Sequence, residues 1–154
     1  MVNLVGARIE RKEDKKFLTG KGRYTADINL SRQTHACFIR SPHARAKINK
    51  VDISKALKAP GVVKILTGED LIKDKIGGLI AGWKIVSQDG KDMKCPPHPP
   101  LAKDVVNFVG DHVAVVIAET LEEAKNAAEQ VNVSYKIQKP VINAADATNF
   151  ENIH

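Results

Sequence analysis

The chain has 154 residues, of which 43% are hydrophobic and 27% charged. This length and composition suit one globular domain with enough apolar material for a core, and we expect a single domain over residues 1–154. No apolar run approaches the roughly 20 residues that cross a bilayer, and the N-terminal segment becomes charged too early for a secretory signal. We therefore expect a cytoplasmic protein without a membrane span.

The net charge of +6 is concentrated near the N-terminus, where residues 1–50 hold 12 Lys and Arg against 4 Asp and Glu. A basic segment could bind nucleic acid, an acidic partner or an anionic cofactor, because positive charge attracts any polyanion. The lysines are scattered between acidic residues, however, and only 5% of the residues are aromatic. No RNA- or DNA-binding motif accompanies them, so we expect no nucleic-acid partner.

The first half of the chain predicts strands separated by turns, with extended segments expected at 34–40, 46–52 and 62–66. Ser54 should cap a short helical turn, and the sequence Thr67-Gly-Glu-Asp70 forms a capping box that predicts a short helix. Glycines and prolines then interrupt every pattern from residue 73 to residue 100. We expect one long loop there, of the kind that is usually functional, mobile or held by a partner.

The last third gives clearer signals. Val113–Ala118 is a continuous apolar run that predicts a buried strand, and Thr120-Leu-Glu-Glu123 is a capping box that should start a helix. An apolar stripe on that helix is predicted from Leu121, Ala124, Ala128 and Val131. Alternating apolar and polar residues then predict a half-buried strand over 131–137. The whole pattern indicates an α+β (mixed α/β) fold, with a mixed sheet of about six strands and two or three helices.

Candidate chemistry is sparse. His35, Cys37, Cys95 and His98 could form a tetrahedral zinc site, but they lack the usual paired spacing. Ser41 and His43 lack the strained turn of a nucleophile, and Gly20 and Gly22 lack the third glycine of a dinucleotide motif. We therefore predict no catalytic, cofactor-binding or metal-binding residue, as is typical of a scaffold or interaction unit.

Several segments in a fixed order are similar to motifs of one family. They are Gly6–Asp14, Leu18–Asp27, Arg40–Ala46, Pro60–Gly68, Leu101-Ala102, Val109–Thr120 and Val133–Tyr135. Together they resemble the N-terminal α/β hammerhead domain of the molybdopterin-binding large subunits in the xanthine dehydrogenase, aldehyde oxidase and carbon monoxide dehydrogenase family. The resemblance departs at Arg45, where the family often has histidine, and at Asp111-His112, where it often has glutamate and proline.

The resemblance implies a structural and assembly domain of a molybdenum hydroxylase, an oxidoreductase, that is inactive alone. Molybdopterin would bind in larger domains outside the 154 residues, and iron–sulfur and FAD groups in partner subunits. The expected contacts to those domains are Arg40, Ser41, His43 and Arg45 in one turn, and Trp83 and Cys95 in the long loop. An alternative is a free-standing binding protein that reuses the hammerhead fold for a small ligand or an acidic partner.

Overall fold

The computed structural model describes residues 5–80 and 82–149, and the chain divides into two compact units, Met1–Gln33 and Thr34–His154. In the first unit, helix α1 (Asp14–Leu18) precedes a short 3₁₀ turn (Thr25–Asp27). The ring of Phe17 stacks on Tyr24 at 5.4 Å between centroids and leaves no space for a Cβ at Gly22. The two glycines of the Gly20-Lys-Gly22 segment therefore serve a tight turn, as their sequence context predicts.

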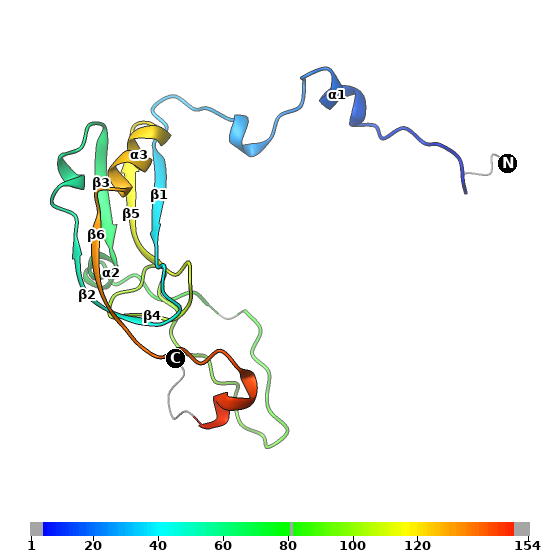
Figure 1. Cartoon of the computed structure of the whole chain (residues 1–154). Helices are drawn as coiled ribbons and strands as arrows, with labels where there is room; N and C mark the ends of the chain where they lie inside the picture. Colours follow the sequence, from blue (N-terminus) through cyan, green and yellow to red (C-terminus); the bar gives the residue numbers. More distant parts are fainter. Residues whose placement is uncertain (1–4, 81, 150–154) are drawn as a thin grey trace. The chain divides into compact units, whose positions relative to one another are not determined.

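The described residues of the second unit form six strands and two helices (Figure 1). The strands are β1 (His35–Arg40), β2 (Ala46–Asp52), β3 (Val62–Thr67), β4 (Val105–Val106), β5 (His112–Ala118) and β6 (Asn132–Ile137). The helices are α2 (Gly68–Lys73) and α3 (Leu121–Ala128), with 3₁₀ turns at Ala56–Lys58 and Ala144–Asn149. The predicted mixed α/β class with six strands is confirmed. The long loop, expected at 73–100, corresponds to residues 74–80 and 82–104, where the structure has no helix and only an isolated bridge between Val86 and Asp92.

The strands form two antiparallel sheets of three strands, in the orders β1-β5-β3 and β4-β2-β6. This arrangement corrects the expected single mixed sheet. Strand β5 pairs with β1 on one edge and with β3 on the other, so no ladder position beside it is open to β6. After α3, β6 therefore pairs with β2, from Ala46 opposite Ile137 to Asp52 opposite Asn132.

Helix α3 packs on the sheet of β1, β5 and β3 (Figure 1). The predicted capping box is present, because the Thr120 hydroxyl accepts the Glu123 N–H at 3.2 Å and the Glu123 carboxylate accepts the Thr120 N–H at 3.0 Å. Ala124 and Ala127 are fully buried, and Ala127 shares a core cluster with Val116 of β5. The predicted stripe was wrong at Leu121, which is 47% exposed in the first helical turn.

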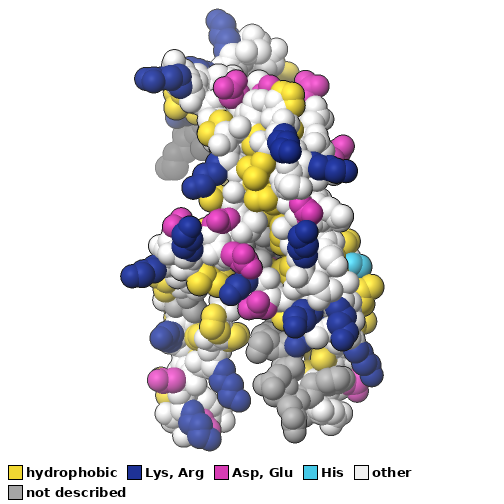
Figure 2. Space-filling view, turned by 90° about the vertical axis from the view of Figure 1, so that its left-hand side faces the viewer, with side chains coloured by type: hydrophobic (Ala, Val, Ile, Leu, Met, Phe, Trp, Pro, Cys, Tyr) yellow, Lys and Arg dark blue, Asp and Glu magenta, His cyan; other side chains and the backbone are white. Residues whose placement is uncertain are grey.

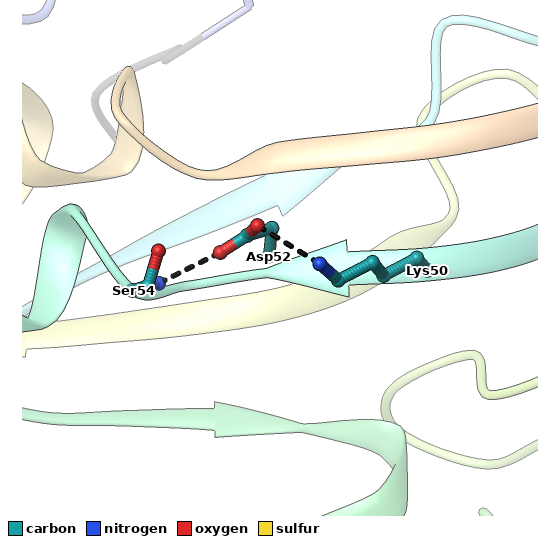
Figure 3. Close-up of polar contacts among 3 residues, drawn as sticks. All are labelled: Lys50, Asp52 and Ser54. Carbon is teal, nitrogen blue, oxygen red and sulfur yellow. Dashed lines mark hydrogen bonds and ion pairs between the residues drawn. The ribbon is translucent and has the colours of Figure 1, made fainter.

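Two local predictions in the middle of the chain had different outcomes. At the start of α2 the Asp70 carboxylate accepts the Thr67 N–H and hydroxyl, both at 2.8 Å, so the predicted cap forms. Ser54 is not the N-cap of the turn at Ala56–Lys58; that position is Lys55, whose side chain makes no capping hydrogen bond. Instead, the Asp52 carboxylate accepts the Ser54 N–H at 3.0 Å and pairs with Lys50 at 3.1 Å (Figure 3). Asp52 lies two residues before Ser54, the spacing at which an aspartate carboxylate commonly bonds to the backbone N–H.

One core cluster joins the two sheets. Val113 of β5 packs with Ala46 and Ile48 of β2 and with Val106 of β4, and each of these residues is at most 8% exposed. The segments that enter and leave these strands must therefore come together. These segments are the turn at 41–45, after β1, and the connection between β4 and β5 at 107–111, and they carry the candidate site.

One face of the surface is drawn in Figure 2 with its charged side chains marked. On the face drawn in Figure 2, Lys and Arg side chains lie among Asp and Glu side chains and apolar ones, instead of gathering in one basic patch. Among the described residues, no helix combines the length and the apolar character that crossing a membrane requires.

Candidate docking surface

The turn that follows β1 is held by the Ser41 side chain, which is only 2% exposed. Its hydroxyl donates to the His43 carbonyl at 2.9 Å and accepts the His43 N–H at 3.0 Å. Its backbone also pairs with the connection before β5: the Ser41 N–H donates to the Asp111 carbonyl, and the Gly110 N–H donates to the Ser41 carbonyl, both at 2.8 Å. Ser41 therefore fixes the turn from inside the domain.

Two nearby side chains also contact neighbouring elements: Arg40 contacts the connection before β5, and His43 contacts the second sheet. The register of β1 shifts between Ile39 and Arg40, a bulge that changes the direction of the strand. Arg40 is exposed, and its guanidinium donates to the Gly110 carbonyl at 3.3 Å. His43 is half-buried, with its ring edge-on to Tyr135 of β6 at 5.0 Å.

Two buried polar atoms close to this turn have no hydrogen-bond partner among the described residues, namely Nε2 of His112 and the hydroxyl of Tyr135. The imidazole of His112 stacks on Phe38 at 4.6 Å. Burial raises the pKa of the Tyr135 phenol, and the charge of Asp111 adds to that rise. The Ser41 hydroxyl acts in the opposite direction and lowers the pKa of Tyr135, but it also hydrogen-bonds to the backbone of His43.

Asp111 is one of the residues that line a pocket of about 230 Å³. The residue is 7% exposed, and its Oδ2 accepts the Asn107 N–H at 3.0 Å. The rest of the lining is mostly apolar and comes from the end of the long loop and from the segment around β4: Pro96, Pro97, His98, Pro99, Ala102, Val105, Asn107 and Phe108. One buried carboxylate thus faces a largely apolar space.

Two further pockets adjoin this one and share walls with it. A pocket of about 250 Å³ includes Arg45 and shares Asn107 and Phe108, whereas a pocket of about 340 Å³ includes Cys95 and shares Pro96 and His98. We refer to these three cavities together as the three-pocket surface. Exposed apolar side chains belong to it, with exposures of 46% for Phe108, 65% for Val109, 92% for Ile80 and 89% for Ile142.

The structure brings some of the predicted contact residues together on this surface. Arg45 and Cys95 line its two outer pockets, and His43 and Arg40 belong to the turn that includes Arg45. Trp83 is 82% exposed but lines none of the three pockets. Sequence reasoning missed Asp111, Asn107 and Phe108 as site residues, since the segment before β5 looked like an ordinary turn. A carboxylate directly before an apolar strand was the available signal.

The geometry does not favour the other chemistries weighed from the sequence. Within residues 5–80 and 82–149, no three His, Cys, Asp or Glu side chains lie close enough together to hold a metal ion, so the cysteine–histidine zinc site does not form. The Ser41 hydroxyl bonds to the backbone of His43 and not to its imidazole, which removes the arrangement a nucleophilic serine needs.

Residues 19–139 match the family model described as the aldehyde oxidase and xanthine dehydrogenase a/b hammerhead domain. The chain belongs to this family. The two sheets, helix α3 and the three-pocket surface are thus parts of a hammerhead domain, and the resemblance noted in the sequence is confirmed.

Relatives and solved structures agree with this assignment. The hammerhead domain is 40% identical over 131 residues to the nicotine 6-hydroxylase large subunit of Paenarthrobacter nicotinovorans, covering 85% of this chain and 15% of that protein. It is 35% identical over 144 residues to the carbon monoxide dehydrogenase large chain of Hydrogenophaga pseudoflava, covering 88% and 16%. The crystal structure of quinoline 2-oxidoreductase from Pseudomonas putida 86 superposes with a TM-score of 0.81 at 34% identity, covering 96% and 18%.

Proposed function

We propose that this hammerhead domain is the N-terminal structural and assembly domain of a molybdenum-cofactor hydroxylase in the cytoplasm, and that it is inactive alone. The observation that carries the proposal is the coverage, since the chain spans only 15–18% of the length of the three proteins compared above. The oxidation chemistry would then belong to the remaining part of such a protein. The substrate would be carbon monoxide, an aldehyde, a purine or a related heterocycle.

The chemistry of the central pocket does not favour molybdopterin as its ligand. Molybdopterin carries a phosphate group, whereas the residues that line the central pocket include Asp111, whose carboxylate would repel it, and neither Lys nor Arg. That pocket is also smaller than the roughly 300–1,000 Å³ typical of sites for larger ligands. We therefore place molybdopterin in a companion chain or domain, and iron–sulfur and FAD groups in partner subunits.

Exposed apolar side chains support an assembly role. In the long loop Trp83, Ile80 and Leu79 are 82%, 92% and 62% exposed. Apolar side chains that gather on a surface mark places where another protein packs. In this proposal Trp83 and Cys95 in the loop, and Arg40, His43 and Arg45 in the turn, contact the cofactor-bearing part, while Ser41 positions that turn.

The proposal is tested by recovering the tagged 154-residue chain gently from its native cells. Mass spectrometry identifies the co-purifying chains, and elemental analysis counts molybdenum and iron per chain. Recovery of a larger chain together with molybdenum and iron is expected. Trp83→Ser should reduce that recovery while the melting temperature stays unchanged, because Trp83 is exposed, and Lys84→Ala serves as the neighbouring control. A bare chain without companions would instead support a free-standing binding protein.

A further inference from the structure

The carboxylate of Asp111 belongs to a mostly buried residue and accepts one hydrogen bond from the described part of the chain. The residue is 7% exposed, and the hydrogen bond from the Asn107 N–H is directed to only one of its oxygens, Oδ2. Taking a carboxylate out of water is costly unless charged or hydrogen-bonding groups compensate. Among residues 5–80 and 82–149, ion pairs join Lys50 to Asp52 and Lys91 to Asp89, and none involves Asp111. The described part of the chain therefore leaves this site open to a cation.

The other residues that line the pocket indicate what kind of cation would fit beside Asp111. Prolines 96, 97 and 99 and the ring of Phe108 provide apolar surface, and neither Lys nor Arg lines the pocket. An aromatic face also attracts cations directly. The volume of about 230 Å³ is too small for a ligand of ordinary drug size but sufficient for one long side chain. A side chain with an alkyl stem and a positively charged end group would match both the apolar walls and the carboxylate of the pocket.

We propose that the Asp111 pocket receives a single Lys or Arg side chain from the cofactor-bearing part of the hydroxylase. The stem of that side chain lies along the prolines and Phe108, and its ammonium or guanidinium group pairs with the Asp111 carboxylate. The inference rests on the proposed function, because it specifies which chemical group of the cofactor-bearing part this domain would recognise. We call that cofactor-bearing part the companion. The coverage of 15–18% supports this source, since in those relatives most of the polypeptide that could cover such a pocket lies outside the matched region.

The first test measures cation binding to the 154-residue chain with n-butylammonium and n-propylguanidinium as probes. Saturating changes in the amide chemical shifts of Asn107, Phe108 and Asp111 are expected at about millimolar concentration. Asp111→Asn keeps an oxygen for the Asn107 N–H but removes the charge, so binding should weaken about tenfold or more. Neutral n-butanol should bind weakly to both proteins, and added salt should weaken only the cationic probes. Equal binding of the cations by both proteins would overturn the proposal.

The second test compares capture of the companion by variants of the chain. Asp111→Asn and Phe108→Ala should each reduce capture about tenfold or more, while Asp89→Asn, which removes an exposed carboxylate of the long loop, should leave it unchanged. Thermal unfolding shows whether each variant is folded. If Asp111→Asn does not fold, the capture measured with Phe108→Ala tests the pocket proposal instead. The Phe108 side chain is 46% exposed, so its removal has a modest effect on the core.

The outcomes separate the two proposals. If the unaltered chain captures the companion and the folded Asp111 and Phe108 variants capture it equally well, the pocket proposal is overturned while the assembly role stands. If the unaltered chain captures nothing, the assembly role fails and the pocket proposal fails with it. Binding of the amine probes without any captured chain would then assign the pocket to a free organic cation.

Discussion

Ser41 and Asp111 are joined through their backbones, with the Ser41 N–H donating to the Asp111 carbonyl at 2.8 Å. This bond ties the turn after β1 to the connection before β5, although the two residues lie far apart in the sequence. On one side of the bond the Ser41 hydroxyl shapes the turn that includes Arg45, and on the other the Asp111 side chain lines the central pocket. Changes at either residue should therefore affect the three-pocket surface.

Ser41→Ala should destabilise the domain. The variant loses the bond to the His43 carbonyl and leaves the His43 N–H without its acceptor in a partly buried turn. We expect the free energy of unfolding to fall by about 1–2 kcal/mol. Chemical denaturation measures this as a lower midpoint with an unchanged slope. Ser134→Ala, at an exposed position of β6, is the matched control. A stability equal to that of the unaltered chain would show that the hydroxyl does not hold the turn.

Tyr135→Phe, unlike Ser41→Ala, should not destabilise the domain, because it removes a buried hydroxyl that has no partner among the described residues. The free energy of unfolding is expected to stay unchanged or to rise by up to about 1 kcal/mol. Burial raises the pKa of Tyr135 above 10.0, so the folded state keeps its proton where the unfolded state loses it. Stability from this group is complete below pH 10.0 and is lost as the pH rises through the folded-state pKa.

The alkaline behaviour supplies the measurement for Tyr135. An absorbance titration of the unaltered chain minus that of Tyr135→Phe should show one phenol titrating above pH 10.0. The loss of stability at high pH should be smaller in the variant. A phenol that titrates at or below its ordinary pKa, or a marked loss of stability in Tyr135→Phe, would mean that the hydroxyl has a partner.

Gly68→Ala should destabilise the junction between α2 and the end of the long loop. A Cβ at this position would lie 2.6 Å from the backbone carbonyl oxygen of Ala102, and backbone cannot move aside as a flexible side chain can. Alanine favours a helix by at most about 1 kcal/mol, whereas overpacking costs about 1–3 kcal/mol, so the clash should dominate. Thermal unfolding tests this against Gly77→Ala, where nothing lies within 4 Å of the new atom. Equal melting temperatures for the two variants would contradict the expectation.

Asp52 should titrate well below its ordinary pKa of 3.8, chiefly because of hydrogen bonds from Ser54 and secondarily because of Lys50 (Figure 3). Ser54→Ala removes the largest contribution and should raise the pKa of Asp52 more than Lys50→Met does. Because the folded-state pKa is lowered, the associated stability is present above pH 3.8 and is lost as the pH falls through the folded-state pKa. Carboxyl chemical shifts followed with pH give the values. A larger rise in Lys50→Met would reverse the assignment of cause.

The sequence by itself determined the elements that depend on near neighbours. The alternation of β6, the apolar run of β5 and the capping box at Thr120 are local patterns, and each appears where the pattern predicts it. The ordered motifs also identified the family. Such local predictions agree with the folded structure because strand alternation and helix capping involve residues within a few positions of one another.

Only the tertiary structure decided how those elements pair and what they place together. Two sheets form because both edges of β5 are occupied, which no local pattern reveals. Ser41 is a buried support and not an exposed contact because the connection before β5 covers it, and Asp111 lines a pocket because the end of the long loop lies opposite. Burial and pocket walls arise from segments distant in sequence, so they follow from the packing of the whole domain and not from the spacing of its residues.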